Sequence, residues 1–251
     1  MSNWVEGRVA SVRRWTDSLF SLGVDAPGIT FTAGQFARVA LPAPPGAKEP
    51  MLGRPYSFVN PPHLRPHEFY VVVVPEGPLS PRLAALDAGD PVWLLAQANG
   101  FFTLEEIPPA ETMWMLATGT GLGPFLSMLR TGMPWERYER VVLVHAVRSG
   151  VELTYRDTIE AIAHEHRGAF HEVRVVSRED VPGALRGRIP ELIDGGQLEF
   201  CVGIPISPEN AQVMLCGNPQ MVEDTQALLG RRGMRRHRRR EPGHVTAETY
   251  W

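Results

Sequence analysis

The chain has 251 residues, of which 43% are hydrophobic and 21% charged, values typical of a globular protein rather than a disordered one. Its formal net charge of -3 argues against a general nucleic-acid-binding protein. Two cysteines cannot by themselves ligate an iron–sulfur cluster or build a zinc site, so we expect no metal centre. The N-terminus lacks the pattern of a signal peptide, and no stretch is apolar enough to span a bilayer. A cytoplasmic protein is therefore expected.

The N-terminal part of the chain has the pattern of a β domain. Short apolar or alternating stretches are separated by turn clusters such as Ala26-Pro27-Gly28. This pattern predicts an antiparallel barrel or sandwich. The expected strands cover residues 5–12, 19–24, 35–41, 56–59, 68–74 and 91–96. Residues 42–50 form a Pro-rich loop, and a short helix is expected over 80–86, with Ser80 as its cap.

Beyond Pro108 and Pro109, strands alternate with helices. Strands are expected over residues 113–117, 141–146, 173–177 and 213–216, and helices over 124–130, 153–166, 188–194 and 221–232. Such alternation predicts a parallel, doubly wound sheet. We therefore expect two domains, residues 1–104 and 105–251, the first a β-barrel and the second an α/β domain.

The tetrapeptide Arg54-Pro55-Tyr56-Ser57 suits a flavin nucleotide. The planar fork of arginine pairs with a pyrophosphate, and tyrosine stacks on a flat ring. The serine hydroxyl can hydrogen-bond a ring nitrogen, and proline stiffens the entry to the strand. The alternative is an arginine and a tyrosine at a barrel rim with no ligand.

A glycine-rich turn, Gly119-Thr120-Gly121, follows an apolar strand and precedes a helix that starts near Pro124. Such a turn lets a pyrophosphate approach bare backbone N–H groups. Its spacing differs from the usual G-x-G-x-x-G pattern, and a tight turn without a ligand is the alternative.

Arginines follow two successive strands of the α/β half. Arg148 follows one and Arg178 the next. Ligands of open α/β sheets bind at the carboxyl ends of the strands, and arginine there fits the 2′-phosphate of NADP. Ser177 could add a hydrogen bond, Arg188 a further charge, and Tyr155 a stacking surface for adenine. Singly, each arginine could also be a solvated surface residue.

Three features of the C-terminal third carry further hypotheses. Cys216 begins the sequence Cys-Gly-Asn-Pro at a strand end, where a small thiol could lie near a nicotinamide; Cys201 is interpreted as a buried small hydrophobic residue. Trp251 could stack on an isoalloxazine ring or pack into a groove. The run Arg231–Arg240 holds seven arginines, which could dock an acidic electron-transfer protein, form a solvated face or bind RNA.

These motifs, in this order, resemble the ferredoxin–NADP⁺ reductase superfamily. The last ten residues and the stretches Phe31–Phe36 and Leu79–Leu83 are similar to bacterial ferredoxin/flavodoxin–NADP⁺ reductases with a C-terminal tryptophan. The likeness covers nearly the whole chain. It implies an FAD-binding β-barrel, an NADP-binding α/β domain, and electron exchange with ferredoxin or flavodoxin.

The resemblance also assigns residues to ligands. The FAD set is Arg54, Pro55, Tyr56, Ser57, Tyr70, Val71, Val73, Pro78, Leu79, Ser80, Thr120, Tyr250 and Trp251. The NADP set is Gly119, Thr120, Gly121, Val147, Arg148, Tyr155, Ser177, Arg178, Arg188, Gly217, Asn218 and Asp224. Ser57, Cys216, Glu248 and Trp251 are implied in catalysis, and Arg235, Arg236, Arg238, Arg239 and Arg240 in partner docking.

In this interpretation Trp251 covers the flavin face that nicotinamide needs, so it must move before hydride can pass. The protein is expected to be a monomer. Three alternatives remain at this stage: a free-flavin or quinone reductase, the electron-transfer subunit of a larger oxidoreductase, and a non-catalytic flavoprotein sensor or adaptor.

Overall fold

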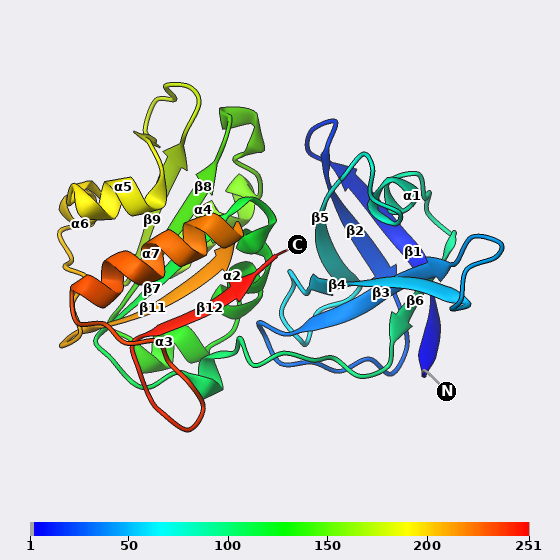
Figure 1. Cartoon of the computed structure of the whole chain (residues 1–251), viewed down its shortest axis with the longest axis horizontal. Coiled ribbons are helices and arrows are strands. Elements are labelled where there is room, and N and C mark those ends of the chain that lie inside the picture. Colours follow the sequence, from blue (N-terminus) through cyan, green and yellow to red (C-terminus); the bar gives the residue numbers. More distant parts are fainter. Residues whose placement is uncertain (1–2, 251) are drawn as a thin grey trace. The chain divides into compact units, whose positions relative to one another are not determined.

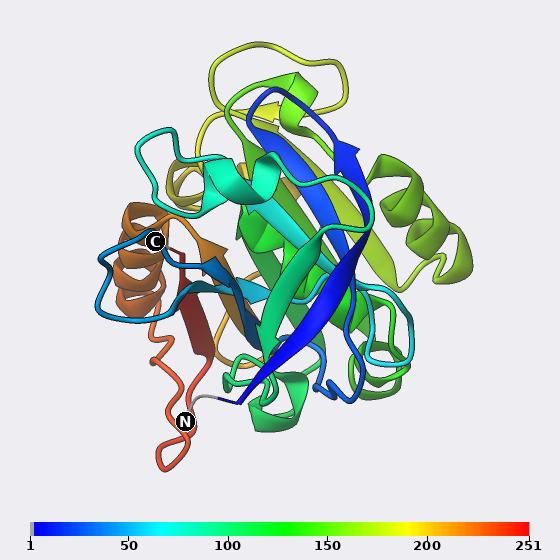
Figure 2. The same ribbon diagram turned by 90° about the vertical axis from the view of Figure 1, so that its right-hand side faces the viewer.

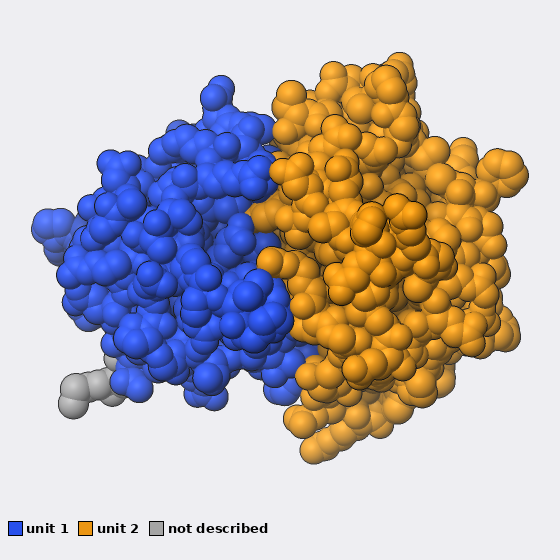
Figure 3. Space-filling model, turned by 180° about the vertical axis from the view of Figure 1, so that it is seen from behind, with its two compact units in different colours: residues 1–103 blue, residues 104–251 orange. Residues whose placement is uncertain are grey.

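The chain divides into two units, Met1–Thr103 and Leu104–Trp251 (Figures 1 and 3). A computed structural model describes residues 3–250. The sheet of the first unit is antiparallel, whereas in the second unit every paired strand of the sheet is parallel. The predicted combination of a β domain with an α/β domain is confirmed.

The first unit is a single curled sheet with one short helix. Its elements are β1 (Trp4–Arg14), β2 (Leu19–Asp25), β3 (Phe36–Pro42), β4 (Met51–Ser57), β5 (His67–Val72), α1 (Ser80–Ala84) and β6 (Pro91–Leu95). The strands follow the order β4-β3-β6-β1-β2-β5. An antiparallel bridge between Phe58 and Phe69 joins the two edges of this order, so the sheet closes into a barrel (Figures 1 and 2).

Aromatic and aliphatic side chains fill the barrel. Phe31 and Phe58 stack at 3.7 Å between ring centroids, and the fully buried His67 packs against both. The strand predicted over 56–59 is instead β4, which begins earlier, at Met51. The length of β4 is set by its pairing with β3. Because β4 lies at the end of the strand order, it can contain Pro55, which has no N–H to donate.

The second unit is a parallel sheet with helices along its crossovers. Its strands are β7 (Thr112–Thr118), β8 (Arg140–Val147), β9 (Phe170–Val176), β10 (Leu185–Arg186), β11 (Ala211–Gly217) and β12 (Val245–Thr249). Its α-helices are α2 (Leu122–Leu129), α3 (Met133–Arg137), α4 (Arg156–Glu165), α5 (Ile189–Asp194), α6 (Gln197–Val202) and α7 (Pro219–Arg231). Short 3₁₀ turns span Leu104–Glu106, Gly119–Gly121 and Gly150–Glu152.

The strand order β10-β9-β8-β7-β11-β12 places β7 and β8 near the middle of the sheet. β7 and β8 are apolar along almost their whole length, as expected for strands covered on both faces. One core cluster joins side chains of β7, β8, β9 and β11 to α5 and α7. Trp114, fully buried on β7, is its largest member.

The structure corrects several element predictions. The helix predicted from residue 153 begins at Arg156, because Tyr155 has φ 57°, a left-handed conformation that cannot continue a right-handed helix. The short elements α3, α6, β10 and β12 were not predicted. They are too short, or in β12 too polar, for a periodic pattern to show.

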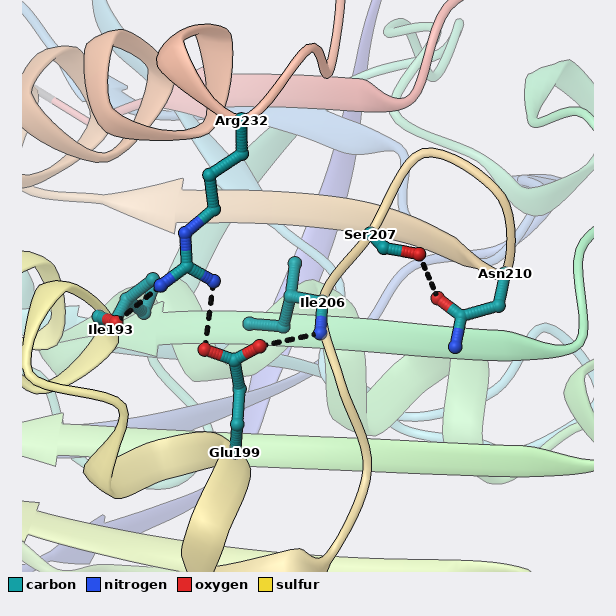
Figure 4. A network of polar contacts seen from close by, with 6 residues as sticks. All are labelled: Ile193, Glu199, Ile206, Ser207, Asn210 and Arg232. Carbon is teal, nitrogen blue, oxygen red and sulfur yellow. Dashed lines mark hydrogen bonds and ion pairs between the residues drawn. The ribbon is translucent and has the colours of Figure 1, made fainter.

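One arginine of the Arg231–Arg240 run has a structural role (Figure 4). Arg232 donates to Glu199 at 2.7 Å and to the carbonyl oxygen of Ile193 at 2.6 Å, and Glu199 also accepts from the backbone N–H of Ile206. The network ties the end of α7 to α5, α6 and the following loop. The run is therefore not a uniform solvated face.

Candidate functional site

The carboxyl ends of β7 and β11 meet at the glycine-rich turn. A Cβ on Gly121 would lie 2.3 Å from the carbonyl oxygen of Cys216, so only glycine allows this approach. Gly119 has φ 52° and nothing within 4 Å of the place where a Cβ would be. The turn therefore packs tightly on one side and leaves backbone open on the other, as binding of a phosphate group to backbone N–H requires.

Thr118, which was not among the predicted site residues, joins the ends of β7 and β11. Its Oγ1 accepts from the backbone N–H of Asn218 at 2.8 Å, and the side chain of Asn218 caps α7 by accepting from Met221 N at 3.1 Å. Gly217, with φ 133°, has no room for a Cβ beside Thr118. Thr118 lies immediately before the glycine-rich turn in the sequence, and this position could have identified it as a site residue.

The Cys216 thiol is fully buried at the end of β11, whereas Cys201, which was expected to be buried, is exposed on α6. Parallel pairing places Cys216 opposite Glu248 on β12, and Tyr250 N donates to the Gly217 carbonyl at 3.0 Å. Burial raises the pKa of Cys216 well above its usual value, the Glu248 carboxylate raises it further, and a hydrogen bond with Tyr250 opposes the rise. Cys216 is therefore a neutral thiol at neutral pH. Trp251, the neighbouring candidate, lies outside the described residues.

The three arginines predicted to bind the 2′-phosphate lie at the ends of three adjacent strands. Arg148 follows β8, Arg178 follows β9 and Arg188 follows β10. The ladder continues past the strands, since Arg178 N donates to the Arg148 carbonyl at 3.0 Å. All three are exposed, and none forms an ion pair with any residue from 3 to 250. Their guanidinium groups are available to an anion.

The structure supports the other predicted NADP residues to different degrees. Ser177 Oγ donates to the Val147 carbonyl at 3.3 Å, which places both beside the arginines. Tyr155 is only 5% exposed, which leaves little of its ring for adenine. Asp224 lies on the exposed face of α7 and accepts from Gln220 at 2.9 Å. Their contacts with a nucleotide stay predictions.

The flavin candidates of the first unit lie mainly on β4 and β5. Arg54 and Pro55 are exposed, Tyr56 is half-buried and Ser57 is buried. Arg54 donates to its neighbour's carbonyl at 3.0 Å. Burial raises the pKa of Tyr56 to about 12, and the Arg54 guanidinium opposes this, so the phenol is neutral at neutral pH. An exposed cation and a neutral aromatic ring on one strand fit a flavin nucleotide.

The second set of flavin candidates runs along β5 and the loop after it. Tyr70, Val71 and Leu79 are buried, whereas Val73 is half-buried and Pro78 is exposed. Ser80 Oγ accepts from Val74 N at 2.9 Å and so closes the loop between β5 and α1. This loop presents backbone, rather than a charged side chain, at Pro78.

The five arginines proposed for docking are exposed on the loop between α7 and β12, the red loop at the bottom of Figure 1. Arg238 lies 3.7 Å from Glu241, and Arg239 lies 3.6 Å from Glu106. The first pair is largely exposed, and in the second the arginine is, so both contribute little to stability. Arg235, Arg236 and Arg240 complete a strongly basic surface.

Within residues 3–250, no group of three His, Cys, Asp or Glu side chains could hold a metal ion. No helix in that described range is long and apolar enough to cross a membrane.

The parallel sheet and its glycine-rich turn are typical of a nucleotide-binding α/β domain, and the comparisons show that this domain belongs to an oxidoreductase. The oxidoreductase NAD-binding domain family matches residues 115–227. The flavodoxin/ferredoxin–NADP reductase of Escherichia coli is 50% identical over 100% of both chains, and the ferredoxin–NADP reductase of Pseudomonas aeruginosa is 36% identical over 99% of this chain and 98% of its own. The chain belongs to the flavodoxin/ferredoxin–NADP reductase family, as its sequence motifs predicted.

A solved structure extends this likeness to the whole fold. The crystal structure of a ferredoxin NADP⁺ reductase from Neisseria gonorrhoeae, with bound FAD and NADP, covers 100% of both chains with a TM-score of 0.92 and 32% identity. The Amycolatopsis cytochrome P450 reductase GcoB is 26% identical with a TM-score of 0.76, over 98% of this chain and 70% of its own.

Proposed function

We propose that this protein transfers hydride between NADP(H) and bound FAD and exchanges single electrons with ferredoxin or flavodoxin. The observation that carries the proposal is the row of three arginines at adjacent strand ends, which have no ion-pair partner among residues 3–250, in a chain 50% identical end to end to flavodoxin/ferredoxin–NADP reductases. A bound flavin supplies the chemistry that converts a hydride into two single electrons.

The protein's own residues hold and orient the two nucleotides. In this proposal Arg54 pairs with the FAD pyrophosphate, Tyr56 stacks on the flavin ring, and Ser57 hydrogen-bonds it. The backbone of the Gly119–Gly121 turn receives the NADP pyrophosphate. Arg148, Arg178 and Arg188 bind the 2′-phosphate.

The end of β11 is the proposed nicotinamide side of the NADP site. The strand ends there at Gly217, which Asn218 follows, and the small neutral thiol of Cys216 is buried immediately before them in the chain. Glu248, opposite Cys216 in the sheet, is the candidate for holding a proton. Trp251, two residues after β12 ends, is the candidate gate for nicotinamide.

The first experiment is a visible spectrum of the purified protein, followed by anaerobic addition of NADPH or NADH. We expect a flavin spectrum that NADPH bleaches at least about 100-fold more efficiently than NADH, because charge-assisted hydrogen bonds to the 2′-phosphate are worth about 1.5–3 kcal/mol each. A colourless protein that FAD does not reconstitute would overturn the proposal, and equal bleaching by both nucleotides would remove its NADP part.

The exposed arginines of the loop between α7 and β12 are the proposed dock for the acidic partner. Replacing Arg235, Arg236 and Arg240 by glutamine should raise the KM for ferredoxin or flavodoxin by about tenfold at low salt, with a smaller effect at high salt, because screening weakens surface charge attraction. NADPH-dependent reduction of ferricyanide is the control and should not change. An equal loss with ferricyanide would place the defect outside docking.

We further propose that the protein acts as a cytoplasmic monomer, which leaves its basic surface open to a diffusing partner. Sedimentation at several protein concentrations tests the monomer, and a constant mass near 27.9 kDa is expected.

A further inference from the structure

Two carboxylates hold the backbone of the loop that carries Arg148. Glu179 Oε1 accepts from the backbone N–H of Gly150 at 2.6 Å, although the two residues come from different loops, after β9 and β8. Glu152 Oε2 accepts from the N–H of Arg148 at 2.9 Å and of Ser149 at 3.4 Å. The backbone from 148 to 150 is thus fixed from both sides by charged acceptors.

The two arginine-bearing loops also touch through a small apolar cluster. Val147, Leu153 and Val176 are buried together, with Val181 packed against them. A Cβ on Gly150 would lie 2.9 Å from a methyl group of Val181, so the loops already approach as closely as side chains allow. Glu179 adds a hydrogen bond from its side chain to the backbone of the other loop.

The chemistry of Glu179 is unexpected beside an anion site. A carboxylate next to Arg178 should either pair with an arginine and neutralise it, or repel a phosphate. Here the Glu179 carboxylate accepts from a backbone N–H instead. Within the part of the chain described, neither Glu179 nor Glu152 forms an ion pair with Arg148, Arg178 or Arg188. The hydrogen bond holds the Glu179 carboxylate on the Gly150 backbone, and the guanidinium groups of the three arginines have no carboxylate partner among residues 3–250.

We propose that Glu179, through Gly150, is a positioning residue that sets the distance between Arg148 and Arg178 and thereby the selectivity for a 2′-phosphate. The inference rests on the proposed NADP function of this edge. Glu179 acts through the loop backbone and does not itself touch the nucleotide. A planar guanidinium binds phosphate strongly only when its fork is aligned, so loosening one loop should weaken binding of the phosphate and spare the rest of the nucleotide.

The test is calorimetric binding of 2′-phospho-AMP and of AMP to the full-length protein and three variants. Glu179→Ala removes both acceptor and charge, Glu179→Gln keeps an oxygen acceptor without the charge, and Asp180→Asn removes a neighbouring charge that pairs with Arg186 instead. We expect Glu179→Ala to weaken 2′-phospho-AMP binding about tenfold, as loss of alignment at one charge-assisted contact would. AMP binding should stay within about twofold, and the other two variants close to wild type.

In turnover, the Glu179→Ala variant should raise the KM for NADPH with kcat unchanged, which a general loss of stability would not do. Unchanged binding of 2′-phospho-AMP by Glu179→Ala would overturn the inference. So would tighter binding by both Glu179 variants, which would make Glu179 a simple repulsive charge. A wild-type protein that does not prefer 2′-phospho-AMP over AMP would overturn the proposed NADP selectivity itself, a separate result.

Discussion

Replacing both Arg148 and Arg178 by alanine is expected to lower kcat/KM for NADPH by about 100-fold or more, because each charge-assisted contact to a phosphate is worth about 1.5–3 kcal/mol. The two guanidinium groups follow neighbouring strands joined by the 3.0 Å hydrogen bond from Arg178 N to the Arg148 carbonyl, and both lack an ion-pair partner among residues 3–250. NADH carries no 2′-phosphate, so its kcat/KM should change by less than about threefold. Steady-state kinetics with both nucleotides measure the effect.

Arg186 provides a matched control for that double variant. It lies on the same edge of the sheet, on β10, but already pairs with Asp180 at 2.7 Å. Arg186→Ala should therefore leave the NADPH preference within about twofold, since an exposed pair contributes little. If the double variant lost NADPH and NADH activity equally, the arginines would serve general attraction of nucleotides rather than recognition of the 2′-phosphate.

Acidification is expected to destabilise both units through one buried histidine in each. His145 in β8 and His67 in β5 are fully buried, and the pKa of each is lowered to about 4, mainly by burial, with the Arg65 guanidinium adding to the effect on His67. Both pKa values are 6.5 in the unfolded chain. Below pH 6.5 the unfolded state binds more protons, so stability falls as the pH falls, and the loss is complete near pH 4.

For His145 the shift corresponds to about 3 kcal/mol of stability lost between neutral pH and pH 4. Urea unfolding at a series of pH values measures this loss. His145→Leu should remove the part of the pH dependence of the unfolding free energy that His145 contributes. His164→Gln, an exposed position in the same unit, is the control that should leave the slope unchanged. A wild-type free energy of unfolding that stays constant from pH 6.5 to pH 4 would contradict the expectation.

Local sequence was sufficient for most of the architecture. Apolar stretches such as 141–146 predict buried strands because a strand covered on both faces admits few polar side chains. Gly119 and Gly121 mark their turn because only glycine fits its conformation and its close contacts. Arg148 and Arg178 could be predicted at one edge because parallel strands all end on the same side of a sheet.

The sequence could not reveal contacts between residues distant along the chain. Glu248 lies opposite Cys216, Glu199 binds Arg232, and Glu179 accepts from Gly150, yet no pattern in the sequence indicates these partners. The strand β12 could not be predicted either, because its residues are mostly polar. They form a strand only through parallel pairing with β11. Periodicity reports which face of an element is buried, whereas the partner of a polar side chain is decided only when the chain folds and brings separate loops together.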